Sequence, residues 1–249
     1  MPRRLLFIYA HPDDESFNVA GVARMYADEG ADIALVTATR GDAGRAGEPP
    51  ICGREELPAR REVELHEAAR ILGIRHVTVL DYLDKHLADA PRDEIRKELV
   101  GAIRRYRPQV VVTFDPDGAN LHPDHIAISR FTIDAVTAAA DARWCSTDGD
   151  AHHVQRLLWT SPVLPWDAPK SADLAREPGV DFLIDISRCR EIKAAALRVH
   201  RTQHVSIDRH FFDLPDVDRI LSVETFRQCF GPAMPTRPLA DIFDSISLY

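Results

Sequence analysis

The sequence predicts an α/β fold: a Rossmann-like, mainly parallel sheet flanked by helices, with a smaller C-terminal lobe that completes a cleft. Short apolar runs alternate with helical stretches through the first half of the chain, and the first run, residues 5–10, is apolar throughout. An uninterrupted apolar run is typical of a strand buried on both faces, and parallel strands require crossover helices between them. We therefore expect a single domain over residues 1–249, with a Rossmann-like core at 1–150 and the lobe at 151–249.

The expected elements of the core follow one another in regular alternation. Residues 16–29 carry apolar side chains at helical spacing and are followed by Gly30, a typical helix end. The remaining core elements are strands at 33–38, 76–80 and 109–114 and helices at 59–73, 93–107 and 124–144. Residues 40–58 are rich in glycine, proline and charge and too long for a routine connection, which indicates a functional loop.

The last third of the chain is less regular. It carries strand-like runs at 156–160 and 181–186 joined by proline-rich connections, and helical patterns at 188–200 and 216–230. We expect this lobe to finish the sheet and form one wall of the cleft. Tryptophans 144, 159 and 166 either pack inside it or line the cleft, and packing is the preferred interpretation.

Composition excludes several classes of protein. The chain has 249 residues, a net charge of −8, 45% apolar and 28% charged residues, as in an ordinary soluble globular protein. Its one basic run, residues 104–107, lies at a helix end, where positive charge complements the macrodipole, so we expect no nucleic-acid partner. The first apolar run is too short for a signal sequence or an integral membrane segment.

Cysteine usage indicates the compartment. The four cysteines are widely spaced and form no C-x-x-C pair: Cys52, Cys145, Cys189 and Cys229. We interpret them as free thiols in a reducing compartment and expect a cytoplasmic protein. A homo-oligomer is compatible with the sequence.

Two clusters of histidine and carboxylate carry the chemistry. One, at residues 10–15 (Ala-His-Pro-Asp-Asp-Glu), follows the first strand, and the other, at residues 115–125, follows the strand at 109–114. In parallel α/β sheets functional groups gather beyond the carboxyl ends of the strands. If these two strands are neighbours, the clusters meet at the topological switch point of the sheet.

The residue types in these clusters suit a divalent metal ion. Catalytic Zn²⁺ takes three ligands from His and Asp/Glu and leaves one position for water, although another metal such as Fe²⁺ accepts similar ligands. His122 and His125 are three residues apart at a helix start, and their spacing leaves open which of them binds metal. Asp13 and Asp14 are adjacent and cannot both point the same way, so one can ligate while the other acts as base.

This division of labour describes amide hydrolysis. A metal lowers the pKa of a bound water, a carboxylate takes its proton, and a histidine opposite stabilises the oxyanion or protonates the leaving amine. Each cluster by itself is also compatible with simple capping of a helix. Two such clusters at corresponding strand ends favour the metal site.

The two motifs together, A-H-P-D-D-E at 10–15 and H-P-D-H at 122–125, resemble the LmbE-like/PIG-L superfamily of zinc-dependent N-deacetylases. Further matching segments are T-R-G-D at 39–42, R-x-x-E-L at 61–65, and Lys193, His200 and Gln203 near the C-terminal lobe. The resemblance therefore extends along most of the chain.

The resemblance implies roles for individual residues. His11, Asp14 and His125 would hold Zn²⁺, Asp13 would be the general base, and His122 would stabilise the oxyanion or protonate the leaving amine. The substrate-binding residues would be Arg61, Asp84, Arg40 and His200. The Arg40 loop departs from the Asn-Gly-Glu of many members. The implied substrate is a small N-acetylglucosamine-type sugar conjugate.

Two rival functions remain. An amidase cleaving another C–N bond, such as a thiol-conjugate amide, would use the same catalytic set and differ in the loops at 40–58 and 160–180. A non-catalytic sugar- or nucleotide-binding protein is the other, but no G-x-G-x-x-G follows the first strand, where a dinucleotide phosphate would bind.

Overall fold

A computed structural model describes residues 2–144 and 149–248, and within them the strands form one sheet of seven. The strands are β1 (Arg4–Tyr9), β2 (Asp32–Thr39), β3 (His76–Tyr82), β4 (Val110–Thr113), β5 (Arg156–Thr160), β6 (Phe182–Asp185) and β7 (Val223–Phe230). Their order is β3-β2-β1-β4-β5-β7-β6. Neighbours among β1 to β5 pair in parallel, whereas β7 runs antiparallel to both β5 and β6. The predicted, mainly parallel α/β sheet is confirmed.

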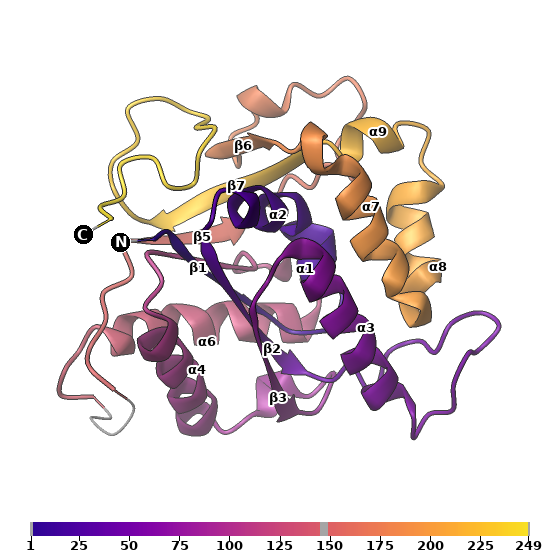
Figure 1. Ribbon diagram of the computed structural model, residues 1–249, viewed down its shortest axis with the longest axis horizontal. Helices are drawn as coiled ribbons and strands as arrows, with labels where there is room; N and C mark the ends of the chain where they lie inside the picture. The colour runs from indigo at the N-terminus through magenta and orange to yellow at the C-terminus, as the bar shows by residue number, and fades with distance from the viewer. Residues whose placement is uncertain (1, 145–148, 249) are drawn as a thin grey trace.

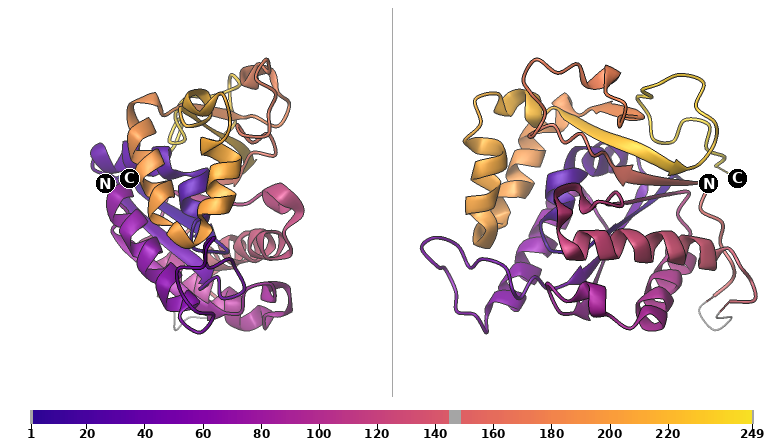
Figure 2. Two further views of the ribbon diagram at one scale, coloured as in Figure 1. Left: turned by 90° about the vertical axis from the view of Figure 1, so that its right-hand side faces the viewer. Right: turned by 180° about the vertical axis from the view of Figure 1, so that it is seen from behind.

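Helices cover both faces of this sheet (Figures 1 and 2). One face carries α2 (Ala20–Asp28), α3 (Leu57–Leu72) and α7 (Arg190–Val199), and the other carries α4 (Arg92–Tyr106) and α6 (Pro123–Ala139). Shorter helices join or extend these: α1 (Asp14–Asn18), α5 (Gly118–Leu121), α8 (His204–Ile207) and α9 (Val217–Ile220). Residues 40–56, between β2 and α3, project from the body at the end of the molecule where α8 lies (Figure 1).

The first strand lies at the centre of the arrangement. Its apolar side chains are buried, as expected for a strand covered on both faces. Phe7 pairs with Leu35 of β2 on one side and with Val112 of β4 on the other. The chain therefore moves outward in both directions from β1, and the expected adjacency of the two motif-bearing strands is confirmed.

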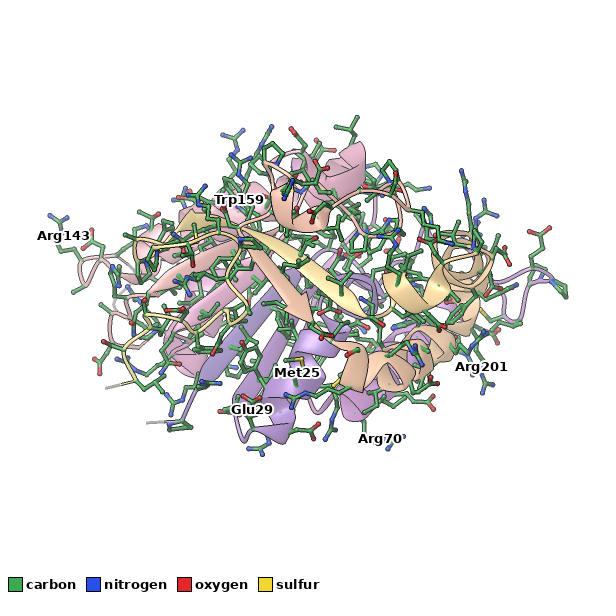
Figure 3. All side chains as sticks on the ribbon, turned by 90° about the horizontal axis from the view of Figure 1, so that it is seen from above. Met25, Glu29, Arg70, Arg143, Trp159 and Arg201 are labelled. Carbon is green, nitrogen blue, oxygen red and sulfur yellow. The ribbon has the colours of Figure 1, made fainter. Side chains whose placement is uncertain are left out.

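The C-terminal part extends the same sheet. Trp159 of β5 pairs with Arg227 of β7, and Figure 3 labels Trp159 where the two strands run together. The helix expected at 216–230 is wrong: α9 ends at Ile220 and Val223–Phe230 is a strand. The backbone of β7 is paired on both sides, by β5 and β6, and these long-range hydrogen bonds override the local helical pattern.

The helix expected at 16–29 is divided at Val19 into α1 and α2. The buried carboxylate of Glu224 accepts hydrogen bonds from the backbone N–H groups of Gly21 and Val22, both at 2.9 Å, and so caps α2. Buried Lys193 donates to Glu224 at 2.8 Å and to the carbonyl oxygen of Phe17 at 3.0 Å. The Lys193–Glu224 ion pair therefore supplies hydrogen-bond partners to the backbone on both sides of the break at Val19.

The basic run at 104–107 lies at the C-terminal end of α4, as expected, and Arg104 has a further role there. Arg104 is buried and donates to the carbonyl oxygens of Asp141 and Trp144, both at 2.8 Å. The helix α6 ends at Ala139 and not near Trp144 as expected. The guanidinium of Arg104 therefore holds the turn that follows α6. Figure 3 shows other arginines far apart, with Arg143 and Arg201 at opposite ends of the molecule.

Two further expectations concern cysteines and membranes. Cys52, Cys189 and Cys229 are free thiols, whereas Cys145 lies outside the described residues. Among the helices of the described ranges, none has the length and apolar character needed to span a bilayer.

Candidate active site

The two histidine–carboxylate clusters meet at the carboxyl ends of β1 and β4. They line a cavity of about 230 Å³, whose opposite wall comes from the C-terminal part of the chain. His11 and His125, 114 residues apart in sequence, approach to 3.2 Å between Nδ1 and Nε2. The predicted meeting of the two clusters is confirmed.

The side chains of three residues converge at this point in a triangle. Nδ1 of His11 and Nε2 of His125 are 3.2 Å apart. One oxygen of the Asp14 carboxylate lies 3.5 Å from His125 Nε2, and its other oxygen lies 3.7 Å from His11 Nδ1. Ligands around a tetrahedral Zn²⁺ with bonds of about 2.0–2.1 Å are separated by about 3.3 Å. The two imidazole nitrogens are therefore spaced as two ligands of such an ion would be, and a carboxylate oxygen of Asp14 lies near each of them.

The hydrogen bonds behind the rings direct the two remaining nitrogens, Nδ1 of His11 and Nε2 of His125, toward each other. His125 donates from Nδ1 to the carbonyl oxygen of Gly118 at 3.1 Å, so its Nε2 carries a lone pair. The Nε2 of His11 lies 3.1 Å from carboxylate oxygens of both Asp84 and Asp124, which leaves His11 Nδ1 as its ligand atom. Phe114 stacks on the His125 ring at 3.9 Å and fixes its plane.

Asp124 supports His11 and was given no separate role in the sequence. It is fully buried and also accepts hydrogen bonds from the backbone N–H groups of Lys85 and Leu87, at 2.6 and 3.1 Å. Its position inside H-P-D-H was the only available signal, because its partners lie elsewhere in the sequence. Carboxylates that orient metal-ligating histidines commonly act in this way.

Within the described residues, two groups that do not include Asp14 bring one ligand-type atom per residue within 4.8 Å of one another: His11 with His122 and His125, and His11 with Asp84 and Asp124. In the second group both carboxylates already engage the outer edge of His11. In the first, Nδ1 of His122 accepts the backbone N–H of Asp124 at 3.2 Å, so only its Nε2 remains available.

The pKa values of the residues in this cluster are strongly shifted from their ordinary values. Although burial lowers the pKa of His11, hydrogen bonds to Asp124 and Asp84 raise it to about 10. Burial raises the pKa of Asp14 to about 7 against the attraction of His11. Burial, together with the charge of His11, holds the pKa of His125 well below its ordinary value. A buried imidazole with a depressed pKa is a neutral ligand.

Asp13 occupies an unusual backbone conformation beside this cluster. Its φ is 127°, outside the regions that L-residues normally adopt, and its side chain lines the cavity. Its carboxylate lies 3.2 Å from Arg61 Nη2. Burial raises the pKa of Asp13 against the opposing charges of Arg61 and His200. This environment suits a carboxylate that accepts and returns a proton.

Glu15 holds the strained backbone of Asp13 in place. Its carboxylate accepts the backbone N–H of Asp13 at 3.1 Å, the hydroxyl of Ser16 at 2.6 Å and Nε2 of His200 at 2.8 Å. Burial raises the pKa of Glu15, but the charge and hydrogen bond of His200 outweigh it and lower the pKa overall. The fully buried Glu15–His200 pair therefore supports Asp13 from behind.

His122 faces the cluster from the start of α6. As the N-cap of that helix it accepts the Asp124 N–H on Nδ1, so its neutral ring carries the proton on Nε2. Burial and the charge of His11 lower the pKa of His122. Its ring centre lies 4.9 Å from that of His11 and 4.7 Å from that of His125. It is thus a neutral hydrogen-bond donor at the cavity wall.

Of the four residues expected to bind substrate, two line the cavity and two do not. Arg61 and Asp84 line the cavity, although Asp84 is also engaged by His11 and by the backbone N–H of Ala43 at 3.1 Å. Arg40 forms ion pairs with Glu62 and Asp81 and is absent from the cavity lining. His200 is buried behind Glu15 and is absent from that lining as well.

The opposite wall contains residues to which no binding role was given. Trp166, interpreted as a packing residue, lines the cavity together with Phe17, Leu164, Gln203, Ser206 and His210. Gln203 also donates to the carbonyl oxygen of Arg45 at 2.7 Å and so ties the 40–56 segment to this wall. The aromatic character of Trp166 was a signal for this role, but packing alone explains most tryptophans.

The chain is similar in sequence to one family of known proteins. The family model described as PIG-L, GlcNAc-PI de-N-acetylase, matches residues 6–136. A 1D-myo-inositol 2-acetamido-2-deoxy-alpha-D-glucopyranoside deacetylase of Streptomyces griseus is 35% identical, over 94% of this chain and 85% of the relative. The deacetylase of the same name from Mycobacteroides abscessus is 33% identical, over 99% of both chains.

Solved structures share the fold. A conserved protein from Thermus thermophilus superposes with a TM-score of 0.69 at 29% identity, over 92% of this chain and 96% of that one. The N,N'-diacetylchitobiose deacetylase of Pyrococcus horikoshii superposes with a TM-score of 0.71 at 23% identity, over 98% of this chain and 89% of that one. At the latter level of identity the likeness concerns the fold.

Proposed function

Because the chain belongs to the PIG-L family of de-N-acetylases, we propose that it removes the N-acetyl group from an N-acetylglucosamine-type sugar conjugate in a metal-dependent hydrolysis. The observation that carries this proposal is the triangle of side chains formed by His11, Asp14 and His125, with Asp13 and His122 on the same cavity. The relatives named above are deacetylases of a glucosaminyl-inositol. We take this chain's substrate to be a small conjugate of that class.

The residues that would hold the metal are His11, Asp14 and His125, and two imidazole nitrogens with one carboxylate suit Zn²⁺ first and Fe²⁺ second. When bound, the metal lowers the pKa of a water molecule and polarises the amide carbonyl. Asp84 and Asp124 would keep His11 in the tautomer that offers Nδ1.

Asp13 is the base in this mechanism. Its carboxylate takes a proton from the attacking water as the oxygen bonds to the acetyl carbon, and it returns that proton to the sugar nitrogen as the C–N bond breaks. Arg61 and the Glu15–His200 pair hold Asp13 in position during both transfers. The products are acetate and an ammonium group on the sugar, because the proton of the new carboxyl group passes to the amine, so atoms and protons balance.

His122 acts on the developing negative charge. Because its pKa is lowered and its Nδ1 is occupied, the ring is neutral at pH 7 and presents Nε2–H to the cavity. A neutral N–H donates a hydrogen bond to the oxyanion without transferring its proton. Of the two roles expected for His122, we therefore propose stabilisation of the oxyanion.

The test uses 1D-myo-inositol 2-acetamido-2-deoxy-α-D-glucopyranoside as substrate. We expect acetate release by protein loaded with Zn²⁺, its loss after chelation, and its return on adding the metal back. Metal content is measured alongside, because a stoichiometric ion should disappear from His125→Ala. Full activity without bound divalent metal would overturn the mechanism.

A further inference from the structure

The cavity has two chemically different walls. One wall holds the proposed metal-binding residues His11, Asp14 and His125, together with Asp13. The other wall is built by Phe17 of α1, by Leu164 and Trp166 after β5, by Ser206 of α8 and by His210 in the turn that follows α8. We call the set Phe17, Trp166, Ser206 and His210 the aromatic wall. In the proposed mechanism the amide that is hydrolysed binds at the first wall. The aromatic wall therefore faces the rest of the substrate.

The orientation of His210 follows from a π-helical turn at Asp208–Phe212. Such turns are rare and occur often at functional sites. His210 Nδ1 lies 2.7 Å from the carbonyl oxygen of Ser206, and since a carbonyl only accepts, Nδ1 must carry the proton. Nε2 of the neutral ring is then an acceptor. Within residues 2–144 and 149–248, no donor to this nitrogen is found.

The aromatic rings of this wall form a cluster supported from behind. Phe17 meets Trp166 edge to face with ring centres 5.9 Å apart, and buried Phe211 packs at 5.0 Å from Phe17 and 5.1 Å from Trp166. Phe17 also lies 6.1 Å from His210. Trp166 and His210 are only half-buried, so part of each ring remains open to the cavity.

A second polar group lies between the two walls. Asn18 lines the cavity and is 6% exposed, and its side-chain nitrogen donates to the carbonyl oxygen of Asp14 at 2.8 Å. Its Oδ1 accepts no hydrogen bond from any described residue. With Asn18 Oδ1 and His210 Nε2, this side of the cavity offers acceptors beside aromatic carbon.

We propose that the aromatic wall is a subsite for a second polyhydroxylated ring, attached to the acetamido sugar, and that His210 Nε2 accepts a hydrogen bond from one of its hydroxyl groups. Such a ring has an apolar C–H face that packs on Trp166 and hydroxyl donors at its edges. A pocket for the acyl chain alone would need no acceptors. This inference rests on the proposed function. It concerns the second ring of the substrate, which is released together with the amino sugar after hydrolysis.

The helix that precedes His210 provides a matched control. His204 begins α8, but it borders a separate hollow of about 430 Å³, together with Arg60, Arg198 and Arg201. Its Nδ1 contacts the carbonyl oxygen of Arg201 at 3.0 Å. His204→Gln therefore changes a histidine six residues before His210 without touching the aromatic wall.

The experiment compares a two-ring and a one-ring substrate: 1D-myo-inositol 2-acetamido-2-deoxy-α-D-glucopyranoside and methyl 2-acetamido-2-deoxy-α-D-glucopyranoside. His210→Phe keeps a ring against Phe17 but removes the acceptor. We expect the KM of this variant for the two-ring substrate to rise roughly two- to tenfold, the cost of one lost hydrogen bond. Its kcat/KM for the one-ring substrate should stay within about twofold. His210→Gln should recover part of the loss, and His204→Gln should alter neither substrate.

Other outcomes overturn the inference. Equal losses for both substrates, or no loss for either, would exclude a second-ring subsite at His210. A changed preference between N-acetyl and N-propionyl forms of the one-ring substrate would assign the wall to the acyl group instead.

If the wild-type enzyme hydrolyses neither substrate, the deacetylase proposal fails, and calorimetric binding then decides the subsite. Tighter binding of the two-ring compound by wild type than by His210→Phe still supports it, and equal binding overturns it.

Discussion

The guanidinium of Arg61 occupies the space in which a side chain at Gly41 would lie. Arg61 Nη1 donates to the carbonyl oxygen of Gly41 at 3.0 Å, and a Cβ atom built on Gly41 would fall 2.0 Å from that same nitrogen. Arg61 also contacts the carboxylate of Asp13. The bare backbone at Gly41 therefore positions Asp13, the proposed base, through one intermediate side chain.

Gly41→Ala should displace Arg61 and with it the carboxylate of Asp13. We expect kcat/KM for acetate release to fall about 10²-fold, the cost of a misplacement near 1 Å. Gly30→Ala is the matched control, because Gly30 has a similar positive φ of 83° but no neighbour within 4 Å of its Cβ position. In both variants, placing alanine at a positive φ destabilises the folded state by about 1–2 kcal/mol. Equal activity in the two would disprove the steric coupling.

Asp13→Asn should remove the base and leave the metal triangle intact. We expect kcat to fall by about 10²–10⁴ at unchanged metal content, since Asp13 is not among the three converging donors. Acetate release and metal analysis on the same preparation check this. Asp89→Asn, with an 83% exposed side chain, is the control. A variant with near-normal kcat would exclude Asp13 as the base.

Asp124→Asn should weaken metal binding although Asp124 is not a proposed ligand. The substitution removes the negative charge behind His11 Nε2 and leaves the size of the side chain unchanged. We expect the Kd for Zn²⁺ to rise about 10–100-fold, as for other orienting carboxylates. Competition with a chromophoric chelator measures it, and exposed Asp117→Asn serves as control. An unchanged Kd would contradict this role.

Lys193→Met should destabilise the protein strongly. Lys193 and Glu224 are 1% and 2% exposed, so removing the ammonium leaves an uncompensated buried carboxylate. We expect the free energy of unfolding to fall by about 3–5 kcal/mol, measured by urea denaturation. Exposed Lys170→Met should change it by less than about 0.5 kcal/mol. A loss below about 1 kcal/mol for Lys193→Met would show that the pair contributes little.

Local sequence patterns predicted the core of the fold but not its interruptions. The strands β1 to β5 and most helices follow from apolar periodicity, which reports burial directly. The break at Val19 does not, because Glu224, which caps α2, lies 203 residues from Gly21. The strand β7 was taken for a helix because its pairing with β5 and β6 is entirely non-local.

The same distinction applies to the site. The strand-end rule predicted that the clusters around His11 and His125 would meet, since the two parent strands share an edge of the sheet. The supporting functions of Glu15 and Asp124 were not predicted, because Glu15 binds His200, 185 residues away, and Asp124 binds His11, 113 residues away. Such contacts exist only in the folded chain.

The adjacency of β1 and β4 also determines when in folding the site can form. Its two histidines are 114 residues apart in sequence, so metal binding requires the long-range pairing that closes last in folds of high contact order. The ion cannot nucleate this fold as it does in a zinc finger. The refolding rate after dilution from denaturant should thus be the same with and without Zn²⁺, whereas the rate of unfolding should fall once the ion is bound.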